Sequence, residues 1–475
     1  MKTKINHIIL LIYAIIVLII LSLVCTSSIF ESLLLVFLVT LITFILKFLE
    51  KKYSLINKLL SNKLAIIILI ILAIILRISL IKFNHGPFYS DEATFYYNAT
   101  NIVNKSPLAN RYIALFPYLY SYIALLSIAM KIFGTTAKTI VILNILIDLI
   151  GALFAYLFGK SFYSDKRSGV LLLLLWLFNP FQIIWCFKAL PINIVNTMFI
   201  ISIYLFNKLT NKRKIKDIII YSIILGLILG ISNMFRPIFI IFIIAIFVYY
   251  IYKIIFDKEK ALKLLASFIL ITICFSSINK LYNLSVSNKT NIPVATSSSG
   301  WCLYVGSNIS SNGSWFEEPK LTTMINDQDM FSPQKIHQYF KDLAINNYKS
   351  YDILTILRLY KNKLHILVGD VDKYSYNQFT DTITNSNAII NIIIKTFTYS
   401  YYFFMLIGNI FVIYKIKTKK IFENLIFLII LELGLIASHL LVEVSPRYFL
   451  PLTVPMIIIL SYSLITLINI KEEAK

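Results

Sequence analysis

The chain has 475 residues, of which 58% are hydrophobic and 14% charged, and its mean hydropathy is +0.79. In soluble proteins roughly 25% of the residues are charged, so this composition excludes a soluble enzyme, a disordered scaffold and a coiled coil. The apolar runs are continuous and about 20 residues long, which is the length a helix needs to cross a bilayer. Strands of a transmembrane β-barrel alternate polar and apolar residues instead. We therefore expect an all-α polytopic membrane protein.

The formal net charge is +22, from 45 Lys and Arg against 23 Asp and Glu. In a soluble protein this excess would suggest nucleic acid. In a membrane protein, basic residues gather in cytoplasmic loops, so we expect membrane lipids and no nucleic acid as partners. The four cysteines show no CxxC or metal-type spacing, which predicts neither a disulfide framework nor a cysteine zinc site.

Thirteen apolar runs are candidates for membrane spans. They cover residues 5–24, 29–49, 64–83, 112–133, 139–158, 168–187, 190–206, 218–233, 236–255, 262–279, 389–414, 421–441 and 448–470. The first run is long, lacks a small-residue cleavage site and is followed by another span, so we do not expect it to be a cleaved signal peptide.

The charge of the connections decides how many runs cross the membrane. Five connections are strongly basic and should face the cytoplasm: residues 50–63, 159–168, 207–217, 253–263 and 415–420. An even number of spans must separate any two of them, but three runs lie between the first and the second. The run 112–133 carries Pro117 and four tyrosines near its start, a composition suited to the membrane interface. The count then becomes twelve spans, with both termini in the cytoplasm.

This topology divides the chain into four parts. These are 1–63, two additional N-terminal spans; 64–279, a transmembrane core with its first outer loop at 84–138; 280–388, an extracytoplasmic loop subdomain; and 389–475, the C-terminal spans. In the large loop, residues 285–315 are rich in Ser, Asn and Gly and predict loops and turns. Ser332 and Pro333 predict a helix start, and a second helix is expected over Tyr351–Ile366.

The strongest local signal is the pair Asp91-Glu92, directly after the run 64–83. Two interpretations are open. Ser90 can cap a helix whose first turn carries acids that favour the helix dipole; alternatively, one acid is a general base at the membrane surface. Neighbouring helical residues point about 100° apart, so we expect only one acid to face the reacting atoms, while the other holds the local fold or a metal.

These residues resemble the GT-C superfamily of polytopic membrane glycosyltransferases, in the branch of the protein O-mannosyltransferases and the lipid A aminoarabinose transferase. Those enzymes carry an acidic motif in the first outer loop, followed by amphipathic helices. Asp91-Glu92 matches the motif, and the run 112–133 matches the helix after it. Residues 179–185 and 445–451 resemble the outer ends of two spans of the bacterial members. Many relatives carry a second acid where this chain has Asn193, which puts a two-carboxylate site there in doubt.

The resemblance implies inverting transfer of one sugar from a polyprenyl-phosphate carrier to an extracytoplasmic acceptor at a bacterial plasma membrane. The acceptor would be a glycan, a teichoic acid, a lipid or a protein. Asp91 would be the base and Glu92 a supporting acid. A phosphate leaving group needs cations, and Arg447 with Tyr448, then Arg236, are the first candidates; Arg111 and Lys188 are weaker ones. For each arginine the alternative is snorkelling to lipid headgroups.

Ionisable residues within spans are candidates for function or for buried pairs. Asp148 has Arg77 as a candidate structural partner, and Glu432 shares a helix face with His439. No cofactor is certain. The candidate ligands for a divalent metal ion are Glu92, His439 and Glu443, and His85 is a further, weaker candidate.

Two other functions remain open. A flippase of lipid-linked oligosaccharides suits twelve spans but usually shows two similar halves, which this chain lacks. A polysaccharide polymerase has many spans and a large outer loop, yet it does not call for an acidic pair after an early span.

Overall fold

The computed structural model describes residues 2–27, 41, 44, 48, 54–79, 88–212, 214–295, 299–327, 330–369, 388–415 and 419–468. Helices account for 84% of the structure, and no strand occurs in these ranges. The prediction of an all-α chain is therefore confirmed. The predicted run 29–49 lies almost wholly outside the described residues, and His85 lies outside them.

Within the described ranges, six segments are long and apolar enough to cross a membrane. They are α8 (Ala137–Tyr163), α11 (Ile192–Thr210), α12 (Ile215–Phe235), α13 (Ile240–Asp257), α14 (Ala261–Thr290) and Pro446–Thr466, which joins η3 (Pro446–Leu452) to α23 (Thr453–Ile468). A seventh is the pair α3 (Leu55–Ser61) and α4 (Lys63–Ser79), bent by 80°. These helices indicate a multi-pass membrane protein. The count of twelve spans and the orientation of the termini stay predictions.

The predicted span 168–187 is wrong as one continuous helix. It consists of α9 (Lys166–Leu177) and the short α10 (Pro180–Trp185). The side chain of Asn179 caps α10 by accepting the backbone N–H of Phe181 at 3.1 Å, and Pro180 occupies the first turn, where its missing N–H is tolerated. The break arises because proline cannot continue α9.

The run 112–133 is also divided. It forms α6 (Asn110–Leu115), a turn around Pro117 and α7 (Leu119–Phe133). At 15 residues α7 is shorter than the roughly 20 residues of a spanning helix. That this run does not cross the membrane, and that it lies at the membrane interface, stay predictions.

The large loop contains more helix than expected. α14 continues past residue 279 to Thr290, and the predicted turns include α15 (Ser299–Ser307). α15 forms because its buried Trp301 and Val305 pack on the amphipathic α17 (Pro333–Ser350). α16 (Pro319–Asn326) also contacts α17.

The two helices predicted in the second half of this loop are present. Ser332 caps α17 by accepting the Lys335 N–H at 3.3 Å. The second is α18 (Ile353–Leu364), continued by the π-helical η2 (His365–Gly369), and Asp352 caps it by accepting the Thr355 N–H at 2.8 Å.

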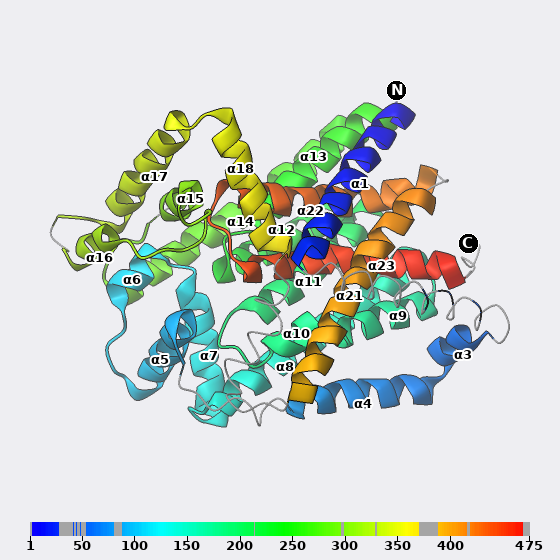
Figure 1. Ribbon diagram of the computed structural model, residues 1–475, viewed down its shortest axis with the longest axis horizontal. Helices are drawn as coiled ribbons and strands as arrows, with labels where there is room; N and C mark the ends of the chain where they lie inside the picture. The colour runs from blue at the N-terminus through cyan, green and yellow to red at the C-terminus, as the bar shows by residue number, and fades with distance from the viewer. Residues whose placement is uncertain are drawn as a thin grey trace.

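Two segments that the sequence predicts to lie outside the membrane, named here the outer segments, meet at one end of the molecule. The first contains α5 (Ser90–Asn104) and α6, and the second contains α15 to α17 (Figure 1). The backbone N–H of Ala295 donates to Ala114 O at 3.1 Å, and His337 Nε2 lies 2.9 Å from Leu115 O. These contacts fix the first outer segment against the second. The remaining helices are α1 (Lys2–Ser27), α21 (Ala388–Lys415) and α22 (Lys419–Leu441).

Below these segments, a buried ion pair joins α4 to α8. Arg77 Nη2 lies 2.7 Å from Asp148 Oδ2, and neither side chain is exposed. Trp176 of α9 donates its indole N–H to Asp148 Oδ1 at 2.8 Å. The interpretation of Arg77 and Asp148 as structural partners is confirmed.

Candidate active site

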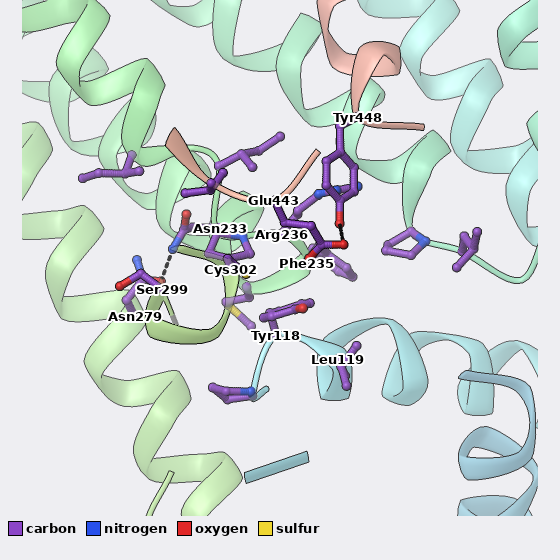
Figure 2. A pocket seen from close by; sticks show the side chains of 18 of the residues that line it. Tyr118, Leu119, Asn233, Phe235, Arg236, Asn279, Ser299, Cys302, Glu443 and Tyr448 are labelled. Atoms are coloured by element: carbon purple, nitrogen blue, oxygen red, sulfur yellow. Dashed lines mark hydrogen bonds between the residues drawn. The ribbon is translucent and has the colours of Figure 1, made fainter. Parts of the chain in front are cut away.

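A cavity of about 550 Å³ lies where the outer segments meet the membrane helices (Figure 2). Its walls come from α5, the α6–α7 turn, the α12–α13 connection, α14, α15 and the segment from α22 to η3. A volume of this size suits a small ligand or the headgroup of a larger one. Of the residues predicted for the site, Asp91, Arg236, His439, Glu443, Arg447 and Tyr448 line it.

The carboxylate of Asp91 faces the guanidinium of Arg447 across the cavity wall. Asp91 Oδ2 and Arg447 Nη2 are 2.5 Å apart, and the two side chains remain 42% and 28% exposed. Asp91 stands in the first turn of α5, while Arg447 lies in η3 at the far end of the sequence. The fold thus joins the first predicted acid to the first predicted phosphate ligand.

Arg236 approaches the same place from the end of α12. Its guanidinium carbon lies 4.1 Å from the centre of the Tyr448 ring, and that of Arg447 lies 5.6 Å from it. Stacking on an aromatic face holds a guanidinium in position while leaving its N–H groups for a ligand. The ring of His439 stacks on Tyr448 with centroids 5.2 Å apart. Tyr448 therefore positions both cations.

Glu443 is the second carboxylate of the cavity. It accepts a hydrogen bond from Tyr448 Oη at 3.2 Å. Burial raises the pKa of this carboxyl, and the nearby Arg447 guanidinium opposes that shift. Its backbone N–H donates to Cys302 O at 2.7 Å, which attaches α15 to the segment after α22. Burial also raises the pKa of the Cys302 thiol to about 12, so that this cavity residue stays protonated at neutral pH.

Glu92 points away from Asp91. Its Oε1 lies 3.1 Å from Lys188 Nζ, and its Oε2 accepts the Ala189 N–H at 2.9 Å. Ser90 does not cap the helix, because its φ is +51° and the start of α5 has no side-chain cap. The division expected for neighbouring helical acids is thus present, with Asp91 at the cavity and Glu92 holding the loop around Lys188.

Three other predicted residues lie away from the cavity wall. Arg111 donates to the backbone carbonyls of Met324, Ile325, Asp327 and Phe331, so its guanidinium holds the outer segments together. Asn193 is buried and donates to Cys186 Sγ at 3.0 Å. Glu432 is buried and accepts a hydrogen bond from Tyr13 Oη at 3.0 Å.

The candidate metal ligands do not come together. Among the described residues, no three His, Cys, Asp or Glu side chains form a group that could hold a metal ion. Glu92 is engaged by Lys188, whereas His439 and Glu443 line the cavity.

The structure adds a group of amides that sequence reasoning missed. Asn233, Asn279 and Asn283 line the cavity, and Asn233 donates from Nδ2 to Asn279 Oδ1 at 2.8 Å (Figure 2). Neutral amides are common in this chain, so their composition gives no signal. Their position in the sequence could have indicated them, because Asn233 is the last residue of one predicted span and Asn279 is the last residue of another.

In the comparison with known proteins, one part of the chain matches the model of a protein family. Residues 117–279 match the dolichyl-phosphate-mannose-protein mannosyltransferase family. This match supports a membrane glycosyltransferase of the GT-C type. Asn233, Arg236 and Asn279 lie within the matched residues, whereas Asp91 and Arg447 lie outside them. No curated protein matches the chain.

Proposed function

We propose that this glycosyltransferase moves a single sugar from a polyprenyl-phosphate carrier to an acceptor hydroxyl on the extracytoplasmic side of the cell membrane. The observation that carries the proposal is the convergence of Asp91 with Arg447 and Arg236 on one cavity. A carboxylate can take a proton from an acceptor, and guanidinium groups bind phosphate oxygens in a forked geometry. Each of the two substrates thus has a partner.

The apolar part of the cavity supports a lipid-linked donor. Phe235, Ile238, Ile240 and Phe275 line it beside Arg236. A polyprenyl phosphate has an anionic head on an apolar chain, so it matches a cation next to apolar side chains of membrane helices. Because such a carrier stays in the bilayer, its sugar is presented at the membrane surface, where the helices of the outer segments meet the spans.

The proposed reaction is a single displacement. Asp91 accepts the proton of the acceptor hydroxyl, whose oxygen forms a bond to the anomeric carbon of the sugar. The bond from that carbon to the phosphate oxygen breaks on the opposite face, and its electron pair leaves with the phosphate. The configuration at the anomeric carbon is inverted. Arg447 and Arg236 stabilise the charge that develops on the phosphate.

The Asp91–Arg447 pair also gives an order to these events. With no phosphate present, the guanidinium of Arg447 holds the carboxylate at 2.5 Å, and this ion pair occupies the oxygen that would receive the proton of the acceptor. A carrier phosphate competes for the same guanidinium. Binding of the donor therefore releases Asp91 for the acceptor.

The proposal is tested by mass spectrometry of envelope glycans in a strain that lacks the gene. The strain is complemented with the wild-type chain, with Asp91→Asn or with Asp342→Asn, which alters an exposed acid of α17. We expect one monosaccharide to disappear on deletion and to return with wild type and Asp342→Asn only. Asp91→Asn should be present in the membrane at a normal level.

Two results would contradict the proposal. Restoration of the sugar by Asp91→Asn would remove Asp91 from the mechanism. Accumulation of a lipid-linked oligosaccharide, with no monosaccharide lost, would indicate a flippase or a polymerase instead.

A further inference from the structure

The amide pair Asn233 and Asn279 joins α12 to α14 at the cavity. The orientation of both amides is fixed by their partners. Asn279 donates from Nδ2 to Phe275 O at 2.7 Å, one turn earlier in α14. It must then offer its oxygen to Asn233, whose Nδ2 donates to it at 2.8 Å. The remaining polar atom of Asn233 is Oδ1, an acceptor.

Asn233 Oδ1 is buried, and no hydrogen-bond donor within the described residues reaches it. Buried polar atoms in proteins are nearly always hydrogen-bonded. Because Asn233 also lines the cavity, a ligand bound there can supply the missing donor. The ligand must bring the donor, because the amide oxygen Oδ1 can only accept a hydrogen bond. A hydroxyl group meets this need without adding a charge.

The position of Asn233 identifies which hydroxyl this is. Asn233 precedes Arg236 by three residues at the end of α12, and both residues line the same cavity. If Arg236 holds the carrier phosphate, the sugar attached directly to that phosphate lies within reach of the amide. The acceptor enters from the side of Asp91, which belongs to α5.

We infer that Asn233, positioned by Asn279, forms a subsite that accepts a hydrogen bond from a hydroxyl of the donor sugar and so favours a neutral, hydroxyl-bearing sugar. The inference rests on the proposed function. It adds a specificity-determining residue, and it predicts that the amide discriminates between sugars while the arginines hold the phosphate common to all donors.

The test compares two probes on the purified full-length protein: a short-chain polyprenyl phosphate, and the same compound carrying mannose. We expect Asn233→Ala to weaken binding of the mannosyl probe about 10-fold, the typical effect of one hydrogen bond to a buried group. Binding of the bare carrier should change less than about 2-fold, because no hydrogen bond to it is lost. Arg236→Gln should weaken both probes.

Ser222→Ala is the matched control. Ser222 Oγ lies 2.7 Å from Ser267 Oγ and joins the same two helices, α12 and α14, away from the cavity. If the amides serve only to hold these helices, Asn233→Ala and Ser222→Ala will lower thermal stability alike and neither will separate the two probes. That result would overturn the inference.

Mono-deoxy derivatives of the sugar identify the hydroxyl. One derivative should lose about 10-fold in affinity for wild type and nothing for Asn233→Ala.

Glucosyl, galactosyl, N-acetylglucosaminyl and aminoarabinosyl carriers form the comparison set. The subsite would be overturned if the carrier of the amino sugar bound most tightly. It would also be overturned if no sugar increased the affinity over that of the bare carrier. An effect of Asn233→Ala on acceptor KM alone would also overturn it. Failure of wild type to bind the bare carrier would instead contradict the proposed function.

Discussion

Asp91 and Arg447, separated by 356 positions in the sequence, lie 2.5 Å apart at the wall of one cavity. Neither side chain is buried, so water and a ligand can reach both partners. Exposed ion pairs contribute little to stability, about 0–1 kcal/mol. The pair is therefore better understood as two halves of a binding site that satisfy each other until a ligand separates them.

The neighbouring pair Glu92 and Lys188 should behave in the opposite way. It is largely buried, and Glu92 also accepts the Ala189 N–H. We predict that Glu92→Gln lowers the free energy of unfolding by about 1–3 kcal/mol, because it leaves a buried ammonium without its counter-charge. Thermal unfolding in detergent measures this. Asp91→Asn is the matched control and should change stability by less than about 1 kcal/mol. Equal losses for the two variants would contradict the division of roles.

The pair Arg77 and Asp148 provides a second test of structural roles. Both side chains are fully buried, and Trp176 donates to the carboxylate. We predict that Arg77→Met alone destabilises the protein by about 3–5 kcal/mol, since it leaves an uncompensated charge among membrane helices. The double variant Arg77→Met/Asp148→Leu should recover a large part of that loss. Additive losses from the two single variants would show that the residues do not depend on each other.

Lys363 of α18 predicts a pH dependence. Its buried Nζ donates to Gly306 O at 3.0 Å and to Leu440 O at 2.6 Å, and burial lowers its pKa to about 7. In an unfolded chain the pKa of lysine is about 10.4. Between these values the unfolded state binds more protons, so stability rises with pH from about 7 upward.

We therefore expect the melting temperature of wild type to increase between about pH 7 and 9 more steeply than that of Lys363→Met. Lys349→Met, which removes an exposed lysine at the end of α17, should follow wild type. The same slope in Lys363→Met as in wild type would assign the pH dependence to other groups.

The sequence singles out several charged residues of the cavity because charge is scarce in this chain. Asp91, Arg236 and Arg447 stand out at the ends of apolar runs, and the fold brings them to one cavity. Arg111 stands out for the same reason, yet it binds backbone carbonyls of the large loop. A charged residue near a membrane surface can hold loops as well as ligands, and only tertiary contacts separate these roles.

Other features were beyond sequence reasoning for physical reasons. The count of apolar runs records hydrophobicity and not helical continuity, so it missed the break between α9 and α10 at Asn179. α15 was missed because its Ser and Gly content suggested turns, while burial of Trp301 stabilises a helix there. The amides at Asn233 and Asn279 carry no charge and gain meaning only from the cavity they line.

A double-mutant cycle for binding of a short-chain polyprenyl phosphate to the purified protein tests whether Arg447 holds the carrier phosphate in competition with Asp91. It uses wild type, Asp91→Asn, Arg447→Gln and the double variant, with Asp342→Asn as control. We predict that Arg447→Gln weakens binding about 10- to 100-fold, as expected for a charged hydrogen-bond donor. Asp91→Asn alone should tighten binding several-fold, because it removes a competitor for the Arg447 guanidinium. In the Arg447→Gln background the same substitution should leave binding unchanged. Unchanged binding in Arg447→Gln would show that the cavity does not hold the carrier phosphate through this residue and would contradict the proposed function.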